Sequence, residues 1–351
     1  MPKYTVLAEI HKELDAKFSP FHGWHLPVNY PGGVLAEHKH VSRFCGIFDS
    51  CHTGKIRIAG ENCAQGLDAV LMYRVSSQEP GKSRQNHLLA ENGCFTAAVS
   101  VFRMAEDDFF MTVSAEQTNG VLKQLSEKLS AQFTVQDLTE PIAKIDLLGP
   151  AALSVLTEAE VEESALPAPG CCGIVEIADI RCIVNNPSDG GIAGYELFCG
   201  ADNAIDLWDE LTCIEPVRPC GCGAREILRI ERGIPAPGTE FNSTVTPLDF
   251  GLEIPEDDFA GKAALSEMKP AASFVFVKLA SRQSVHAGDK LCLSSGDEAG
   301  SVTSACVSSV TDCACAICKI KSDIKLNAED EVLVLSGSSS LPGIVCVPDS
   351  K

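Results

Sequence analysis

The sequence predicts an α+β fold whose C-terminal part is a small all-β barrel. Segments with helical spacing and segments that alternate apolar with polar residues are mixed along the chain, without the regular strand–helix–strand alternation of a parallel α/β sheet. Beyond Pro270 the pattern changes to short strands separated by Gly, Ser and Asp, which is typical of a small antiparallel barrel. At 351 residues the chain is too long for one simple core, so two or three domains are expected.

Each expected element follows from a local pattern. Helices are expected where apolar residues recur at spacings of three and four, and in chain order these segments are 5–17, 63–72, 117–131, one that starts at Pro150, 201–211 and 223–233. Strands are expected where apolar and polar residues alternate or apolar residues dominate, namely at 55–60, 95–103, 109–113, 144–148 and 195–199, with a hairpin over 175–184. The acidic, proline-containing stretch from 157 to 170 is expected to be a surface loop.

The net charge restricts the partners. The chain carries 28 basic and 48 acidic residues, for a formal charge of −20. Nucleic acids and anionic membranes both require a basic surface, so neither is expected as a partner. The first thirty residues lack a signal-peptide pattern, and no apolar run is long enough to span a membrane. A cytoplasmic location is therefore expected.

Seventeen cysteines are present, and most lie next to apolar residues, where a thiol serves as a small hydrophobe. The clusters Cys220–Cys222 and Cys313–Cys318 lack the paired second half and the histidine that make zinc sites recognisable. We therefore expect reduced thiols, no structural metal and no stabilising disulfides.

Three arginines fall on one face of the helix expected at 223–233. Arg225, Arg229 and Arg232 stand at positions i, i+4 and i+7, while apolar residues form another face. An arginine held on a packed helix is a rigid fork suited to a carboxylate or a planar polar ligand. The alternative is a solvated face on which the arginines pair with the glutamates of the same helix. Periodicity alone leaves both interpretations open.

Ordered motifs run along nearly the whole chain. Besides the Gly-Ala-Arg-Glu run at 223–226 and Gly194-Tyr195-Glu196, they are found at 21–30, 37–38, 43, 46–55, 148–152, 246–249, 259–262 and 300–304. Taken together, they resemble the glycine cleavage T-protein family, the aminomethyltransferases. A single motif of this kind is weak, whereas the ordered series is specific.

The resemblance implies an architecture. Members of the family form a three-domain cloverleaf around a central folate cavity, with which the α+β pattern and the C-terminal barrel are compatible. On this basis we expect a discontinuous folate-binding domain at 1–54 and 140–265, an inserted α+β domain at 55–139 and a β-barrel domain at 270–351.

The resemblance also implies site residues. The glutamate of the family's Gly-Phe-Glu run matches Glu196, and the arginine of its Gly-Ala-Arg-Asp run matches Arg225. Both belong to the family's folate site, so tetrahydrofolate is the expected cofactor. A carboxylate suits the side-by-side donors of a pterin ring, and an arginine suits the glutamate tail or a ring carbonyl. The lipoylated H-protein is the expected protein partner.

Several departures from the family pattern affect polar groups. The paired aspartates that follow a Gly-Gly-Val-Ile run appear here as Ala97 and Ala98, which can neither accept a proton nor orient a folate nitrogen. An expected tyrosine appears as Gln85, an expected asparagine as Ser114, and two acids of a Gly-Glu-Asp-Gly loop are missing from Gly191–Gly194. We therefore assign no catalytic residue and no metal ligand. The pattern indicates a retained fold with altered or lost chemistry.

Three functions remain open. The first is tetrahydrofolate-dependent aminomethyl transfer in the glycine cleavage system, impaired by the missing aspartate. The second is a tetrahydrofolate-dependent demethylase or methyltransferase of a small methylated substrate. The third is a non-catalytic folate-binding protein. Dependence on the H-protein, turnover of a free methylated compound and binding without turnover distinguish the three.

Overall fold

The structure is a computed structural model that describes residues 3–129, 131–188 and 192–347. The chain divides into two compact units. The first unit comprises Met1–Leu89, Thr96–Ala224 and Pro255–Ala260, and the second comprises Ala90–Phe95, Arg225–Ile254 and Gly261–Lys351. This division does not test the three domain boundaries expected from the resemblance, which stay predictions.

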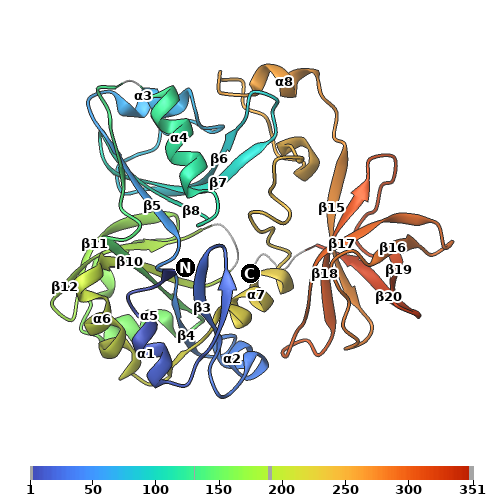
Figure 1. Ribbon diagram of the computed structural model, residues 1–351, viewed down its shortest axis with the longest axis horizontal. Helices are drawn as coiled ribbons and strands as arrows, with labels where there is room; N and C mark the ends of the chain where they lie inside the picture. The colour runs from blue at the N-terminus through green and yellow to red at the C-terminus, as the bar shows by residue number, and fades with distance from the viewer. Residues whose placement is uncertain (1–2, 130, 189–191, 348–351) are drawn as a thin grey trace. The chain divides into compact units, whose positions relative to one another are not determined.

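A six-stranded mixed sheet organises the first unit (Figure 1). In order across the sheet, its strands are β11 (Cys171–Ile177), β12 (Ile180–Asn186), β13 (Gly194–Gly200), β10 (Ile142–Leu148), β4 (Cys45–Asp49) and β14 (Val217–Pro219). The odd-numbered residues of β10 and β13, such as Ile145, Leu147 and Leu197, face an apolar core. Three helices bury apolar side chains in that core: α1 (Ala8–Glu13), α5 (Ala152–Glu158) and α6 (Ala204–Thr212).

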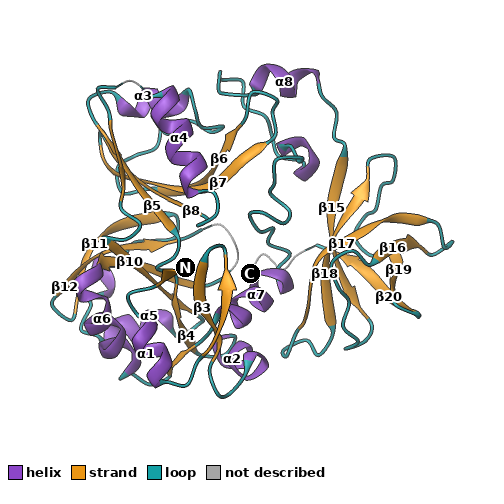
Figure 2. Ribbon diagram, in the orientation of Figure 1, coloured by secondary structure: helices purple, strands orange, loops and turns teal. Residues whose placement is uncertain are grey.

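The same unit contains a five-stranded sheet. Its strands, in order, are β6 (Ser83–Leu89), β7 (Phe95–Ala105), β8 (Asp108–Val113), β5 (Gly54–Ala59) and β9 (Thr134–Asp137). Helices α3 (Cys63–Asp68) and α4 (Thr118–Lys128) pack on one face and close a second apolar core (Figure 2). The strands and helices expected in this part of the sequence are thus present, with shorter helices.

Aromatic side chains join the two sheets. Phe102 of β7 and Phe110 of β8 contact Phe198 of β13, with ring centroids 5.7 and 5.2 Å from that of Phe198. All three rings are buried. Because side chains alternate between the two faces of a strand, the even-numbered residues of β7 and β8 face the even-numbered residues of β10 and β13. Polar residues on these two surfaces therefore belong to one region of the first unit.

A short helix and a small sheet precede this region. The helix expected at 5–17 is shorter than the sequence pattern: α1 ends at Glu13, Asp15 adopts a left-handed φ of 55°, and a strand begins at Lys17. The three-stranded sheet beside this helix has the order β1 (Lys3–Tyr4), β3 (Trp24–Asn29) and β2 (Lys17–Phe21). Helix α2 (Val34–Val41) comes next in the chain.

A buried polar chain ties these N-terminal elements to the six-stranded sheet. Asp49 at the end of β4 accepts hydrogen bonds from the hydroxyl of Thr5, from His11 Nε2 at 3.0 Å and from the backbone N–H of Cys51. His11 in turn is hydrogen bonded through Nδ1 to the hydroxyl of Tyr30. Burial by itself would raise the pKa of Asp49, but the hydrogen bond and charge of His11 outweigh it and lower the pKa to about 2.

Replacing Asp49 with asparagine is expected to lower the free energy of unfolding by about 2 kcal/mol at pH 7. The folded pKa lies below the ordinary value of 3.8, so the unfolded chain binds more protons between about pH 4 and pH 2. The stabilisation is therefore present above pH 4 and is lost as the pH falls through 2. Urea unfolding followed by the fluorescence of Trp208, whose ring lies 5.0 Å from that of His11, measures the difference. The expectation would be contradicted if the free energies of unfolding of Asp49→Asn and wild type differed by the same amount at every pH from about 4 to 2.

The second unit contains a closed six-stranded barrel. Its strands, in order around the barrel, are β15 (Ala272–Leu279), β18 (Ala314–Lys321), β17 (Glu298–Val307), β16 (Lys290–Leu293), β19 (Glu331–Ser336) and β20 (Ser339–Cys346). Their inward side chains, among them Val277, Leu291 and Val334, form its core. Helix α8 (Lys262–Glu267) precedes the barrel. The expected α+β class and C-terminal barrel are confirmed.

Candidate functional site

Glu196 lies on the even-numbered face of β13, and both of its carboxylate oxygens accept hydrogen bonds. Lys144 of β10 donates from Nζ to Oε1 at 2.8 Å, and Asn185 of β12 donates from Nδ2 to Oε2 at 2.7 Å. The side chain of Glu196 is 17% exposed, whereas those of Lys144 and Asp146 are 3% and 0% exposed. The carboxylate is therefore the solvent-accessible part of a buried polar cluster.

Two hydroxyl groups complete this cluster. Ser50 donates to Asp146 Oδ2 at 2.6 Å, and Lys144 donates to the other oxygen of Asp146. Ser83 donates to Asn185 Oδ1, so the amide must present its NH₂ group to Glu196. We call this set the Glu196 network; its members are Ser50, Ser83, Lys144, Asp146, Asn185 and Glu196.

Of this network, only Glu196 was expected from the sequence. A signal for two others is present in the strand at 142–148, where Lys144 and Asp146 occupy alternate positions among apolar residues. Polar side chains at one parity of an otherwise apolar strand indicate a face that is not part of the apolar core. The contributions of Asn185 and the two serines depend on strand pairing across the sheet and leave no such local pattern.

The network leaves Glu196 with unused acceptor capacity. An ionised carboxylate has about four lone-pair sites, and the hydrogen bonds from Lys144 and Asn185 use one on each oxygen. Within the described residues, one site on each oxygen is left, so the carboxylate can still accept two further hydrogen bonds. Two free acceptor sites on one carboxylate are compatible with a ligand that has two N–H donors side by side, as a pterin ring has.

A second buried lysine lies on the facing sheet. Lys55 of β5 is fully buried and donates from Nζ to the backbone carbonyl of Cys51 at 2.7 Å. Burial lowers its pKa to about 8, and the positive charge of Lys144 acts in the same direction. Lys55 thus gives up its proton more readily than an ordinary lysine does.

The two alanines that replace the family's aspartates lie in different environments. Ala97 is 0% exposed and is part of the apolar core between the five-stranded sheet and its helices. Ala98 is half-buried on the opposite face of β7, the face that also carries Phe102. The expectation that both positions lost a site carboxylate is therefore corrected: only Ala98 lies on the surface that faces β10 and β13.

The other departures lie near the ends of strands. Gln85 is exposed on β6, and Ser114 is half-buried directly after β8. The backbone carbonyl of Ser114 accepts the hydroxyl of Thr118 at the start of α4. Of the loop at 191–194, residue 191 lies outside the described residues, and Gly194 begins β13.

The expected arginine-bearing helix is α7 (Cys222–Glu231), and the guanidinium of Arg229 on this helix is engaged by side chains of the protein itself. The side chain of Arg229 is 12% exposed, and its guanidinium bonds to both carboxylate oxygens of Glu226, to Glu240 Oε2 and to Ser304 Oγ. The pairing with Glu226 is that expected for a surface helix, yet the arginine is half-buried rather than solvated. Glu240 also accepts the hydroxyl of Thr303, so these contacts fasten α7 to barrel strand β17.

Arg225 remains the candidate ligand residue of this helix. It is half-buried and lies in the second unit, whereas Glu196 lies in the first. Their joint action on one ligand therefore stays a prediction.

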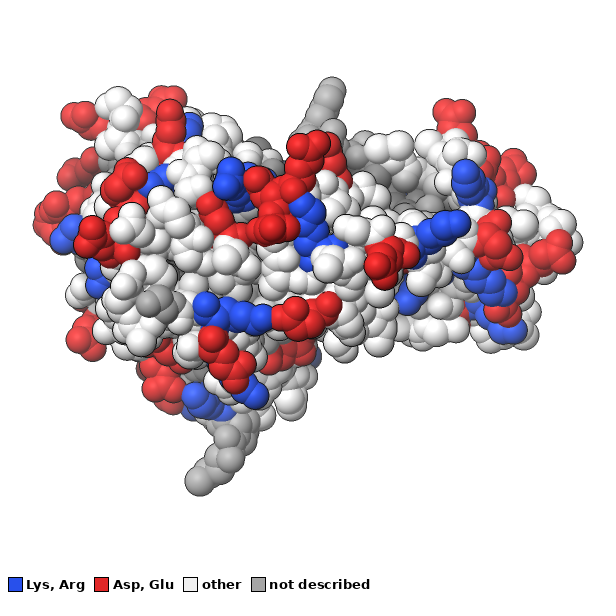
Figure 3. Space-filling model, turned by 90° about the horizontal axis from the view of Figure 1, so that it is seen from above, with Lys and Arg blue, Asp and Glu red and all other residues white. Residues whose placement is uncertain are grey.

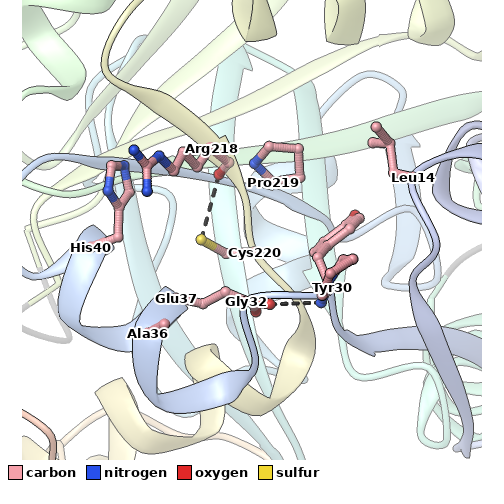
Figure 4. A pocket seen from close by; sticks show the side chains of 10 residues that line it. Leu14, Tyr30, Gly32, Ala36, Glu37, His40, Arg218, Pro219 and Cys220 are labelled. Atoms are coloured by element: carbon pink, nitrogen blue, oxygen red, sulfur yellow. Dashed lines mark hydrogen bonds between the residues drawn. The ribbon is translucent and has the colours of Figure 1, made fainter.

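A pocket of about 320 Å³ lies elsewhere in the first unit, between α2 and β14 (Figure 4). Neither Glu196 nor Arg225 lines it. The carboxylate of Glu37 in its wall accepts the backbone N–H groups of Tyr30 and Gly221, and His40 donates to the carbonyl of Pro216. These polar groups are already satisfied by the protein, so they fix the loop and helix around them.

Charged side chains of both signs are interspersed on the molecular face shown in Figure 3, where acidic residues are the more frequent. Among the described residues, no three His, Cys, Asp or Glu side chains are arranged to hold a metal ion. The seventeen cysteines are free thiols, and burial raises the pKa of several of them, such as Cys318, to about 12. In the described part of the chain, no helix is long and apolar enough to cross a membrane.

A family model described as the GCVT N-terminal domain matches residues 7–255. The chain belongs to the glycine cleavage T-protein family. The aminomethyltransferase of Geobacillus thermodenitrificans is 30% identical over 315 residues, which cover 86% of either chain. That of Geobacillus kaustophilus is 27% identical over 99% of this chain and 98% of its own.

The fold agrees with this membership. The crystal structure of the glycine cleavage system aminomethyltransferase T from Bartonella henselae matches with a TM-score of 0.90 at 26% identity, over 99% of this chain and 97% of that one. The resemblance inferred from the ordered sequence motifs is confirmed, and T-proteins are transferases.

Proposed function

We propose that this T-protein transfers the aminomethyl carbon from the lipoyl arm of an H-protein to tetrahydrofolate, with release of ammonia, at a reduced rate. The proposal is supported by the match over nearly the full length of the aminomethyltransferases and by the Glu196 network. The observation that carries it is the carboxylate of Glu196, which is fixed by two donors and still has two lone-pair sites left.

The residues of this chain would bind and orient the folate. Glu196 would accept the paired donors of the pterin ring, while Arg225 would bind the glutamate tail or a ring carbonyl. Tetrahydrofolate supplies the nitrogen atoms that take up the one-carbon unit. Holding them against a tethered substrate contributes to the rate by positioning alone, which requires no protein carboxylate at position 98.

The reduced rate follows from Ala98. Its methyl group can neither accept a proton nor orient a folate nitrogen, and a missing general acid or base costs about a hundredfold to ten-thousandfold. Glu91 and Asp107 lie beyond the two ends of β7 and not on the strand itself, so they are poor substitutes.

The test is a transfer assay with tetrahydrofolate and an H-protein whose reduced lipoyl arm already carries the aminomethyl group. We expect ammonia and methylene-tetrahydrofolate in equal amounts, with no product when unlipoylated H-protein is used. Folate binding without turnover would contradict the transferase and favour a binding protein. Turnover of a free methylated compound in the absence of H-protein would favour a demethylase or methyltransferase.

A further inference from the structure

The carboxylate of Glu196 stands opposite a second carboxylate. In the antiparallel register of β10 and β13, Asp146 and Glu196 are cross-strand partners, and both belong to the Glu196 network. Like charges in directly opposed positions destabilise a strand pair, and the repulsion increases where water is excluded. Two ionised carboxylates at these positions therefore require a cation between them.

Lys144 provides that cation. Its Nζ donates to Oδ1 of Asp146 and to Oε1 of Glu196. The ammonium group also lies 5.7 Å from the centroid of the Phe198 ring, and the side chain is 3% exposed. The lysine is thus held in one place by two carboxylates and an aromatic ring, where it fixes one oxygen of Glu196 while Asn185 fixes the other.

We propose that Lys144 is a positioning residue for the folate: its ammonium group offsets the repulsion between the opposed carboxylates of Asp146 and Glu196 and directs the Glu196 carboxylate to the ligand. The inference rests on the proposed function. Lys144 and Asp146 are the charged groups that face Glu196 from β10, and Asn185 of β12 is neutral. Lys55 of β5 donates to the carbonyl of Cys51, and its own pKa is lowered by burial and by the charge of Lys144. Without Lys144, the two opposed carboxylates would share one proton.

The consequence is a change in both affinity and proton exchange. In Lys144→Met, the proton shared by the two carboxylates must dissociate before Glu196 can accept two hydrogen bonds from the ligand. We expect the dissociation constant for tetrahydrofolate to rise about tenfold to a hundredfold, and binding to release a proton that wild type does not release. Anaerobic calorimetric titration in two buffers of different ionisation enthalpy measures both quantities.

Two further variants separate positioning from structure. Lys144→Met/Asp146→Asn removes the opposed charge, so it should recover most of the lost affinity and bind without proton release. Lys55→Met removes another buried lysine of the first unit, one that donates to Cys51 instead of Glu196, and should change the affinity by less than about threefold. Should Lys144→Met fail to fold, Lys144→Gln carries the same expectations.

The outcomes separate this inference from the proposed function. Weaker binding with proton release in Lys144→Met, restored by Asp146→Asn, supports the inference. Wild-type affinity in Lys144→Met, equal losses in Lys55→Met, or no recovery in the double variant overturns it and leaves the proposed function standing. Absence of tetrahydrofolate binding by wild type overturns both.

Discussion

Replacing Ala98 with aspartate is expected to raise the H-protein-dependent formation of methylene-tetrahydrofolate about a hundredfold or more, the effect of one well-placed acid or base. Ala98 is half-buried on the face of β7 that is turned toward β10 and β13, the strands that carry Lys144 and Glu196. A carboxylate there would be partly solvated and would lie on the surface that faces the strand of Glu196. Initial rates at saturating H-protein, for wild type and Ala98→Asp, measure the gain.

Ala97→Asp is the matched control for this experiment. The same side chain is added one residue earlier on the same strand, but its carboxylate enters the apolar core at a position that is 0% exposed. We expect no gain in rate and a loss of about 3–5 kcal/mol in the free energy of unfolding, the cost of an uncompensated buried charge.

Two results would contradict the expectation for Ala98. A wild-type rate equal to that of an aspartate-bearing homologue would show that the chemistry proceeds without this carboxylate. A folded Ala98→Asp that binds tetrahydrofolate with no gain in rate would instead favour the demethylase or the binding protein, because the surroundings of the folate would then have diverged as well.

Replacing Glu196 with alanine is expected to weaken tetrahydrofolate binding by about 2–4 kcal/mol, roughly thirtyfold to a thousandfold in the dissociation constant. The ligand's two donors lose their acceptors, and Lys144 and Asn185 lose the group to which they donate. Glu196→Gln should not restore the affinity, because its NH₂ group would face a donor. Calorimetric titration measures the loss.

Glu176→Ala is the control for Glu196, since Glu176 is an exposed glutamate on the edge strand β11 of the same sheet. Its affinity should equal that of wild type. The role of Arg225 is tested in the same series: Arg225→Ala should weaken binding by a similar amount, and the two losses should add in the double variant if the residues bind different parts of the ligand. Equal affinities for Glu196→Ala and wild type would exclude the assignment.

The local sequence determined most of the secondary structure and the C-terminal barrel. Apolar spacing predicted α4 and α6, and the change of pattern beyond Pro270 predicted the barrel. These elements depend on which face of a helix or strand is apolar, and that property can be read from neighbouring residues. The helix expected at 5–17 was too long because its end depends on the left-handed backbone at Asp15, which composition does not reveal.

The sequence also determined the family, and with it Glu196 and Arg225 as candidates, because ordered motifs are a property of the chain itself. Only the tertiary structure decided what surrounds Glu196. Lys144 of β10 and Asn185 of β12 reach it through strand pairing. Ser83 of β6 and Ser50 contact these strands at Asn185 and Asp146, so the network spans up to 146 residues of sequence, between Ser50 and Glu196. The same packing assigned Arg229 to an internal ion pair and gave Ala97 and Ala98 opposite faces, because the position of a side chain relative to a core is fixed only when the core forms.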